Sequence, residues 1–402
     1  MIIGDGYLRP DGRKGIRNVV AVVYLVECAH HVARRVVDRA DDPDVHLLGF
    51  PGCYPNDYAL RMMKTLATHP NVGGAVLVSL GCEGFDREGL AASIADSGRP
   101  VETVVIQEAG GTRSGIDSAL DAVRRVQAEM RALEMRVPMR MSELTIGTIC
   151  GGSDGTSGIA ANPAVGRAFD LLIDAGATCI FEETGEMIGC EGAMSVRAAN
   201  PQVAEAIGTS IENAETYYRA MGYGSFAPGN AEGGLSTLEE KSAGAYVKSG
   251  SRPIDGVIRP TQLPDTPGLY LLDVVPAEPP RFGFPNISDN AEIVELMSCG
   301  AHLTLFTTGR GSVVGSAIAP VIKITGNPET YAKMREDMDV DAGRVMLGEA
   351  SLDDLGTELF DLVLAVARGA QTRSEALGHR EFILGYKSID AVGPACHPGG
   401  GR

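Results

Sequence analysis

Residues 19–28, VVAVVYLVEC, decide the fold of the first part of the chain. They begin with eight apolar residues in a row, most of them valine, which is typical of a strand buried on both faces of a parallel sheet. Similar runs stand at 45–50 and 74–80, and stretches with helical spacing lie between the runs, at 31–38 and 58–67. Alternating strands and helices place the strands parallel to one another. The sequence therefore predicts an α/β fold whose first domain is a parallel sheet of the Rossmann or flavodoxin type.

A cysteine follows each of these three runs, at the turn after the strand. Cys28 comes after the first run, Cys53 ends a Pro-Gly-Cys turn, and Cys82 precedes Glu83 in a Gly-Cys-Glu turn. Because the carboxyl ends of parallel strands share one edge of a sheet, we expect the three thiols to lie together there. Thiolates suit iron, so these cysteines and Glu83 are predicted metal ligands. The alternative is that each cysteine is a small apolar residue at a strand end.

A fourth strand is predicted at 101–106, and the turn after it reaches the same edge of the sheet. Gly110, Gly111 and Thr112 then open a helix. The free N–H groups at the start of a helix favour an anion. The sequence therefore predicts that these three residues bind part of an anionic substrate, next to the thiols.

The length and charge of the chain limit what it can be. A chain of 402 residues exceeds what one hydrophobic core usually supports, and we expect three α/β units at 1–141, 142–226 and 227–402. The net charge of −17 argues against nucleic acid or an anionic membrane as a partner. No apolar run reaches the ~20 residues of a membrane span, and the amino terminus lacks the features of a signal peptide. A cytoplasmic location is predicted.

Two Gly-rich turns mark the second and third units. CGGSD at 150–154 follows a predicted strand at 144–149, and TGRG at 308–311 follows one at 302–306. Neither turn has the lysine or the glycine spacing of a nucleotide-binding loop, so no nucleotide is expected. Arg310 stands between two glycines, where a guanidinium can present two parallel N–H groups to a carboxylate.

Carboxylates gather after the predicted strand at 177–181. Glu183 and Glu186 lie there in a loop that glycines interrupt. A glutamate in such a loop can act as a general base or bind a metal ion. A solvated loop that caps the next helix is the alternative, and the sequence leaves both readings open.

Several strings, taken together, resemble the altronate/galactarate dehydratase family. They are GYLRPDGRKGIRN at 6–18, HPNV at 69–72, LGCE at 80–83, CGGSD at 150–154 with SG at 157–158 and NP at 162–163, GN at 229–230 with GG at 233–234, EKS at 240–242, and TGRG at 308–311. The resemblance implies an enzyme that removes water from a sugar acid, an aldonate or aldarate such as altronate or galactarate, to give a 2-keto-3-deoxy acid. It also implies dependence on ferrous iron or a similar divalent ion, such as Mn²⁺.

The resemblance, together with the patterns above, assigns roles to individual residues. The expected catalytic residues are Glu183, Glu186, Lys241 and His302. The expected substrate-binding residues are Arg17, Asn18, Gly110, Gly111, Thr112, Ser153, Asp154, Asn162, Thr308 and Arg310. The expected metal ligands are Cys28, Cys53, Cys82, Glu83 and Cys150. Whether the metal is one Fe²⁺ ion or a 4Fe–4S cluster stays open.

The start of the chain bears on its expected partners. Many family members carry a domain of the SAF type ahead of the Gly-Tyr opening, and this chain begins at that opening. In this it resembles the large subunit of a split enzyme, which would have a small SAF-domain subunit as a partner, or a form that does without that domain. We also expect a homo-oligomer.

A sister group, the large subunit of sulfolactate sulfo-lyase, also lacks the SAF domain. Its pattern lacks the three cysteines and has Cys-Gly-Glu-Ser in place of residues 150–153, where this chain follows the dehydratases. Carbon–sulfur elimination from (2R)-sulfolactate stays an alternative function. A non-catalytic subunit that binds a sugar acid or serves as a scaffold is a second alternative.

Overall fold

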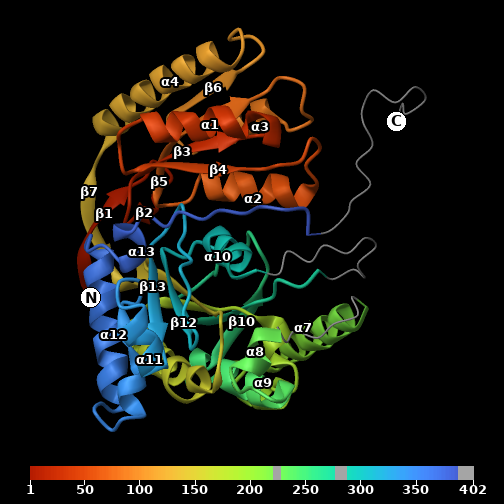
Figure 1. The fold of residues 1–402 in the computed structure, drawn as a ribbon, viewed down its shortest axis with the longest axis vertical. Helices are drawn as coiled ribbons and strands as arrows, with labels where there is room; N and C mark the ends of the chain where they lie inside the picture. The colour runs from red at the N-terminus through yellow and green to blue at the C-terminus, as the bar shows by residue number, and fades with distance from the viewer. Residues whose placement is uncertain (221–227, 277–287, 388–402) are drawn as a thin grey trace. The chain divides into compact units, whose positions relative to one another are not determined.

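The computed structural model describes residues 1–220, 228–276 and 288–387 (Figure 1). The fold is α/β, as predicted, with two separate parallel sheets. Among the described residues, the chain forms two compact units. The smaller unit contains residues 6–137 and 382–387, and the larger unit contains residues 1–5, 138–276 and 288–381.

The smaller unit is built on a four-stranded parallel sheet in the order β4-β3-β5-β6. Its elements are β3 (Val19–Tyr24), α1 (Glu27–Arg39), β4 (Val45–Gly49), α2 (Asp57–Ala67), β5 (Val72–Ser79), α3 (Arg87–Asp96), β6 (Val101–Val105) and α4 (Thr112–Leu133). The second strand along the chain lies outside the first, and the third and fourth follow on the other side. This is the flavodoxin-like strand order.

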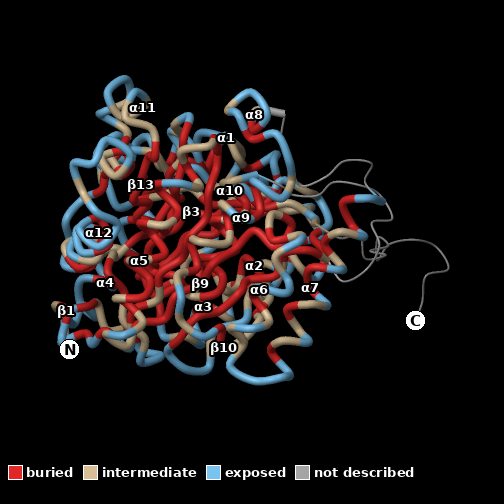
Figure 2. The backbone as a smooth tube through the Cα atoms, turned by 90° about the horizontal axis from the view of Figure 1, so that it is seen from below, coloured by how far each residue is buried: buried red, intermediate tan, exposed pale blue. Residues whose placement is uncertain are grey.

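Helices cover the sheet of the smaller unit because its strands are apolar on both faces. The first five residues of β3 are all buried, and its trace is buried in Figure 2. Val22 and Val76 belong to one apolar cluster with Val32 of α1 and Val123 of α4. Helices α2 and α3 pack on each other and on β5. The continuous valine run is therefore explained by burial between two helical layers.

Two strands carry the chain between the units. They are β1 (Ile2–Leu8) and β7 (Arg136–Arg140), which form a small sheet with β2 (Lys14–Gly15) in the order β2-β1-β7.

The larger unit contains a seven-stranded parallel sheet in the order β10-β11-β9-β8-β12-β13-β14. The strands are β8 (Thr145–Cys150), β9 (Thr178–Phe181), β10 (Ile254–Ile258), β11 (Leu269–Leu272), β12 (Leu303–Thr308), β13 (Val321–Thr325) and β14 (Val340–Asp341). Strands from 142–226 and from 227–402 thus share one sheet. The predicted boundary at 226/227 lies outside the described residues, and the division into three domains stays a prediction.

Helices and short helical turns surround this sheet. They are η1 (Met141–Glu143), η2 (Ser157–Ala161), α5 (Asn162–Asp174), η3 (Thr184–Met187), α6 (Glu191–Val196), α7 (Pro201–Ala220), α8 (Pro228–Glu232), α9 (Leu238–Tyr246), η4 (Val247–Ser249), α10 (Asp289–Ser298), α11 (Pro328–Lys333), η5 (Ala342–Val345), α12 (Leu352–Ala367) and α13 (Arg373–Ala376). Helix α12 packs on α5, and α10 packs on β8. Within the described ranges, no helix is both long and apolar enough to span a membrane.

Candidate active site

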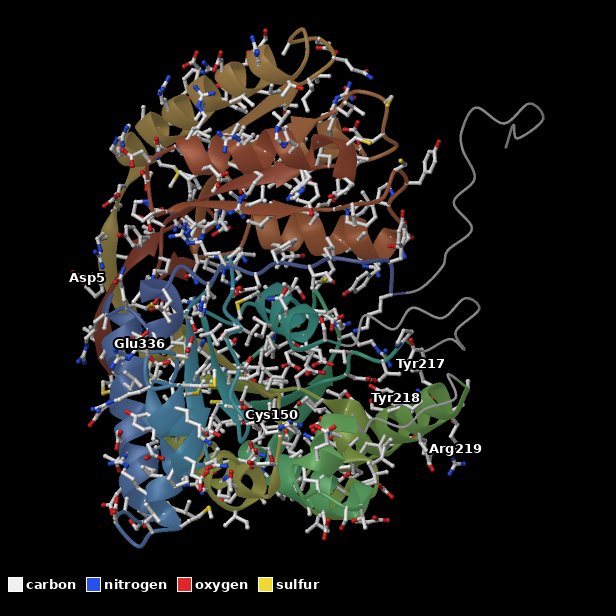
Figure 3. All side chains as sticks on the ribbon, viewed as in Figure 1. Asp5, Cys150, Tyr217, Tyr218, Arg219 and Glu336 are labelled. Carbon is white, nitrogen blue, oxygen red and sulfur yellow. The ribbon has the colours of Figure 1, made fainter. Side chains whose placement is uncertain are left out.

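A buried thiol at the end of β8 is surrounded by charged side chains. Cys150, labelled in Figure 3, is 3% exposed. Its Sγ lies 3.2 Å from Oε1 of Glu183 and 3.3 Å from Oε2 of Glu186. The Lys241 ammonium donates to the same sulfur over 3.2 Å. We call these four residues the Cys150 cluster.

The sheet brings the acidic residues of the cluster to the thiol. Cys150 is the last residue of β8, and β9 pairs with β8 in parallel. Glu183 follows the end of β9 by two residues, and Glu186 lies in the next turn, η3. Ligands of open α/β sheets bind beyond the carboxyl ends of the strands, where successive strands leave in opposite directions. β8 is at such a point, because β9 lies on one side of it and β12 on the other.

The backbone of Glu183 is strained. Its φ is +89° and its ψ is +50°, in the left-handed region that residues with a side chain rarely adopt. Such a conformation costs on the order of 1–3 kcal/mol and occurs preferentially at functional sites. Here it lets the carboxylate point back toward Cys150 while the chain turns into η3.

Two buried lysines balance the two carboxylates. Lys241 of α9 donates to Ser153 Oγ over 2.9 Å and lies 2.6 Å from Glu186 Oε2. Lys248 of η4 is fully buried and pairs with Glu183. With a neutral thiol the charges cancel, and with a thiolate the group carries one net negative charge. A divalent cation would then leave one net positive charge, which suits an anionic substrate in a chain of net charge −17.

Lys241 keeps its proton in this arrangement. Burial lowers its pKa, but the sulfur of Cys150 and the carboxylate of Glu186 raise it by more, so the pKa lies above the ordinary value. Helix α9, which carries Lys241, is capped at its start by Thr237, whose side chain accepts from the Glu240 N–H. A proton is therefore held at one defined atom of the site.

A further carboxylate, Asp289, lies beside the Gly-rich turn. It is the first residue of α10, and a side chain at Gly151 would place its Cβ 2.0 Å from Asp289 Oδ2. Burial and the negative charge of Glu186 raise the pKa of Asp289 to about 6. Asp289 is thus a candidate proton carrier that the sequence analysis missed.

Asp289 should make stability depend on pH. Its pKa is above the ~3.9 of an unfolded chain, so the folded state binds the proton more tightly. The protonated form therefore favours folding at about pH 4, and this contribution is lost as the pH rises through 6. We expect Asp289→Asn to stabilise the metal-free protein on the order of 2 kcal/mol more at neutral pH than at about pH 4. Urea unfolding at both pH values measures this, and a pH-independent difference would contradict it.

The Gly-rich turns expected to bind substrate are joined by backbone contacts. The Gly152 carbonyl accepts from the N–H groups of Gly309 and Arg310. Thr308 Oγ1 accepts from the Gly311 N–H. Asp154 accepts from Thr156 and Ser157 and so closes its own turn. Of these residues, Ser153 contacts the Cys150 cluster directly: its Oγ accepts from Lys241 and donates to Cys150 Sγ over 3.4 Å.

Arg310 does not point its guanidinium at the cluster in this structure. Its Nη1 donates to the Gly229 carbonyl over 2.6 Å, and its Nη2 lies 3.2 Å from Glu232 of α8. The side chain is 44% exposed. Its expected contact with a substrate carboxylate stays a prediction.

Helix α9, which carries Lys241, is held close to η2, a single π-helical turn. Asn162 donates to the Gly244 carbonyl over 2.7 Å and accepts from Thr307. Gly158 and Gly244 face each other so closely that a Cβ at 158 would lie 2.9 Å from the Gly244 Cα. Asn162, an expected substrate residue, therefore serves here to position α9.

This approach of two glycines gives a stability prediction. Gly158→Ala should destabilise the fold by about 1–3 kcal/mol, because the new methyl group meets backbone that cannot rotate away. The matched control is Gly208→Ala in α7, where no atom lies within 4 Å of the added Cβ. That change should stabilise by about 0.5–1 kcal/mol. Thermal unfolding of both variants measures the contrast, and equal shifts would refute the close contact.

The structure places His302 apart from the Cys150 cluster. This buried residue lies just before β12, and its Nδ1 accepts from the Thr145 N–H at the start of β8. Cys150 pairs with Thr307, five residues further along β12, which is ~16 Å away at the rise of a strand. His302 therefore stands at the amino edge of the sheet, opposite the Cys150 cluster, and serves the packing of that edge.

The smaller unit contains the remaining expected residues, at two opposite edges of its sheet. Cys28, Cys53 and Cys82 are exposed at the carboxyl edge. Gly110 and Gly111 precede α4 at that edge with positive φ, and Thr112 begins the helix. Glu83 also lies there, and its Oε2 accepts from the Gly81 N–H.

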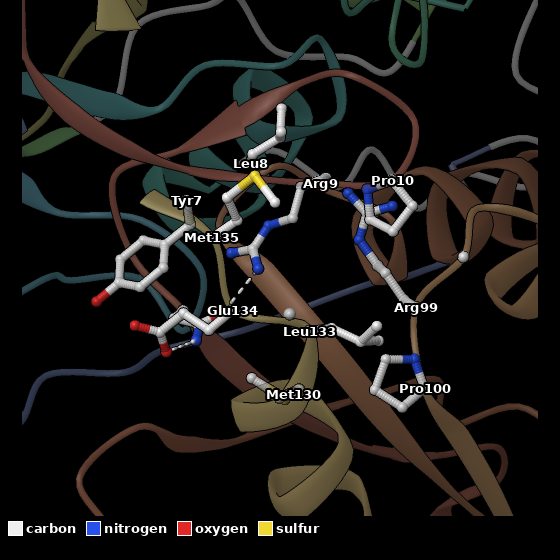
Figure 4. A pocket seen from close by; sticks show the side chains of 13 residues that line it. Tyr7, Leu8, Arg9, Pro10, Arg99, Pro100, Met130, Leu133, Glu134 and Met135 are labelled. Atoms are coloured by element: carbon white, nitrogen blue, oxygen red, sulfur yellow. Dashed lines mark hydrogen bonds between the residues drawn. The ribbon is translucent and has the colours of Figure 1, made fainter. Parts of the chain in front are cut away.

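Arg17 and Asn18 lie at the amino edge instead. They precede β3, and Asn18 accepts from Arg9 over 2.7 Å. Asn18 lines a pocket with Arg9, Arg99 and Glu134 (Figure 4). Within this unit, the structure therefore does not bring Arg17 and Asn18 together with the thiols.

Two family models match the chain. That of D-galactarate/altronate dehydratase, C-terminal, matches residues 141–389, and that of D-galactarate dehydratase/altronate hydrolase, second domain, matches residues 6–131. The first alone covers more than half of the chain. The chain belongs to the galactarate and altronate dehydratase family. The resemblance inferred from the sequence motifs is confirmed.

Individual relatives in this family differ in the reactions they are named for. The chain is 34% identical to (2R)-sulfolactate sulfo-lyase subunit beta of Chromohalobacter salexigens, over 94% of this chain and 96% of the relative. It is 30% identical to altronate dehydratase of Escherichia coli, over 95% and 77% of the two chains. It is 32% identical to galactarate dehydratase (L-threo-forming) of the same organism, over 91% and 72%. All three are lyases, and this member of the dehydratase family is a lyase.

The Cys150 cluster of this family member has a donor set that fits a metal ion. Among the described residues, Cys150, Glu183 and Glu186 form the one group of three potential ligands whose donor atoms lie within 4.8 Å of one another. One thiolate with two carboxylate oxygens suits an ion that is intermediate between hard and soft, such as Fe²⁺. Lys241 contacts two of the three ligands, so a bound ion would share them with its ammonium.

Some residues of this site carried too weak a signal in the sequence to be predicted. Lys248 follows a tyrosine and a valine at a helix end and looks like a surface lysine. Asp289 follows Ser288 and looks like an ordinary helix cap. Tyr218, labelled in Figure 3, lies with its ring against Gly185, and burial with nearby glutamates raises its pKa. These three residues can be recognised as part of the site only in the folded structure, where residues distant in sequence pack against them.

Proposed function

We propose that this protein is a metal-dependent dehydratase that converts an aldonate or aldarate into a 2-keto-3-deoxy acid. The observation that carries the proposal is the Cys150 cluster, in which a buried lysine ammonium contacts two of three converging ligand atoms. The names of the altronate and galactarate dehydratase relatives support the reaction class. Fe²⁺ is the ion we propose, with Mn²⁺ as the second choice.

The reaction requires a proton to leave carbon 2 of the acid and hydroxide to leave carbon 3. A divalent ion held by Cys150, Glu183 and Glu186 would stabilise the negative charge that develops beside the carboxylate. Lys241, which holds a proton, is the proposed proton donor to the hydroxide that leaves carbon 3, because its Nζ is buried and Ser153 orients it from one side. A positioned acid or base contributes about 10²–10⁴-fold to such a reaction.

The other charged residues of the site have supporting roles in this proposal. Lys248 pairs with Glu183 and helps to hold its carboxylate in place. Asp289, with a pKa of about 6, can receive or return a proton near neutral pH. Arg310 is the proposed partner of a substrate carboxylate, once its guanidinium turns from α8.

The assembly of the protein belongs to the same proposal. One relative is named as a subunit beta, which supports a second subunit in that protein. We propose a small SAF-domain partner and a homo-oligomer of the present chain, in the cytoplasm.

Carbon–sulfur elimination from (2R)-sulfolactate is the second candidate function. The sulfo-lyase relative favours it, because that relative matches over 96% of its own length at 34% identity. The same proton abstraction would serve both reactions, with sulfite leaving in place of hydroxide.

Product analysis of anaerobically purified, iron-loaded protein tests the proposal. The protein is incubated with a set of aldonates and aldarates, and separately with (2R)-sulfolactate. We expect a 2-keto-3-deoxy acid from at least one sugar acid. Pyruvate and sulfite from sulfolactate alone would establish the second function. Binding without turnover, also with a small SAF-domain subunit added, would favour a non-catalytic subunit.

A further inference from the structure

Three thiols of the smaller unit stand at equivalent places on three neighbouring strands. Cys28 lies four residues beyond the end of β3, Cys53 four beyond the end of β4, and Cys82 three beyond the end of β5. These strands are adjacent in the sheet, in the order β4-β3-β5, so their ends are ~4.8 Å apart from neighbour to neighbour. All three cysteines are free and exposed. The Cys150 cluster of the larger unit uses none of them.

Backbone hydrogen bonds join the three turns that carry these thiols. The Glu27 N–H donates to the Pro51 carbonyl over 3.0 Å, which links the first turn to the second. The Gly84 N–H donates to the Cys53 carbonyl over 2.7 Å, which links the second turn to the third. The ring of Tyr54 covers Gly84, where a Cβ would lie 2.7 Å from it. The turns therefore form one connected rim, and we call it the thiol rim.

A buried carboxylate oxygen of the rim lacks a hydrogen-bond partner among the described residues. It is Oε1 of Glu83, next to Cys82, while its Oε2 accepts from the Gly81 N–H. Buried polar atoms in folded proteins normally have a partner, and an exception is a place where a water, an ion or another group can bind. Helix α1 begins at the rim, and its N-cap Val26 provides no side-chain cap.

The spacing of the thiols bears on what they could hold. Among the described residues, the three sulfur atoms are not gathered within 4.8 Å of one another, as the ligands of a single ion would be. Thiolates that bind different irons of one cluster stand further apart than that, because sulfide ions lie between the irons. Thiolates are soft ligands, and cysteine thiolates are the usual ligands of iron–sulfur clusters.

We propose that Cys28, Cys53 and Cys82 bind an iron–sulfur cluster on the thiol rim, as a second metal centre besides the Cys150 cluster. Three cysteine ligands leave one iron of a 4Fe–4S cluster open, and Glu83, which follows Cys82, carries the buried carboxylate oxygen described above. Assembly of the cluster in its 2+ state takes two ferrous ions, two ferric ions and four sulfide ions, and iron–thiolate bonds form as the three thiols release their protons to solvent.

The test is iron and acid-labile sulfide analysis of the full chain, purified anaerobically and reconstituted with iron and sulfide. We expect about four irons and four sulfides per chain in the cluster. We also expect Cys28→Ser, Cys53→Ser and Cys82→Ser each to lose most of the sulfide. Cys190→Ser, a change of a partly exposed cysteine in the larger unit, should retain all of it.

A second variant separates this proposal from the proposed function. Cys150→Ala should keep the sulfide of the iron–sulfur cluster while it loses turnover. An error in the proposed iron–sulfur cluster and an error in the proposed dehydratase reaction therefore give different results. Wild-type protein that binds no sulfide after reconstitution would refute the proposed iron–sulfur cluster. Full sulfide content in Cys53→Ser would refute it as well. The three thiols are exposed, so before reconstitution the cluster-free serine variants should unfold at the temperature of the cluster-free wild type. Any loss of sulfide can then be assigned to the missing ligand.

Discussion

Cys150→Ala is expected to lower turnover by on the order of 10³-fold or more, because a Lewis acid supplies several kcal/mol and this variant loses a ligand for it. The thiol is the central member of the Cys150 cluster, within 3.3 Å of both carboxylates and the lysine. The variant should also release the metal ion that the wild type retains on gel filtration. Turnover with saturating sugar acid and metal content measured on the same sample test both effects.

Cys179→Ala is the matched control for this prediction. Cys179 is also fully buried, in β9 of the same sheet, and burial raises its pKa. Removing its sulfur leaves a similar cavity but touches no member of the Cys150 cluster, so metal content and turnover should stay at the wild-type level. Equal losses in the two variants would mean that the effect comes from packing and that Cys150 is not a ligand.

Lys241→Met is expected to lower turnover by about 10²–10⁴-fold, the contribution of a positioned proton carrier. Methionine keeps the length of the side chain and removes the charge. The change also leaves Glu186 without the ammonium that lies 2.6 Å from it. Breaking a buried ion pair costs about 3–5 kcal/mol, and we expect the lower end because Glu186 is partly exposed. Turnover and the free energy of unfolding are the two measurements.

Lys333→Met provides the comparison for both measurements. Lys333 pairs with Glu329 on the surface of α11, where both side chains are more than 70% exposed. Its loss should change stability by about 0.5 kcal/mol or less and leave turnover unchanged. If Lys241→Met retained full turnover in spite of lower stability, Lys241 would be a structural counter-ion and another group would carry the proton.

The local part of the fold was predictable from the sequence. The valine run at β3, and the runs at β4 and β5, match the strands to within two residues, because burial on both faces requires continuous apolar sequence. Pairing between distant strands was not predictable. β8 and β12 are neighbours although some 150 residues separate them, and nothing in the period of the apolar residues encodes that contact.

The candidate site was also predictable only in part from the sequence. Cys150, Glu183, Glu186 and Lys241 were expected individually, since three of them follow strands or Gly-rich turns, and the structure brings all four together. His302 lies apart from these four residues, and its position before a strand already indicated the amino edge. Lys248 and Asp289 were missed because a buried charge and a surface charge look alike in sequence.

Anomalous diffraction at the iron edge from anaerobically grown crystals of the iron-loaded protein tests the central claim most directly. The account predicts an anomalous peak bonded to Cys150 Sγ and to a carboxylate oxygen of Glu183 and of Glu186, with Lys241 beside it. A crystal of active, iron-loaded protein without an anomalous peak at these three residues would contradict it. In that case the Lys241 ammonium alone would lie between the sulfur and the carboxylates.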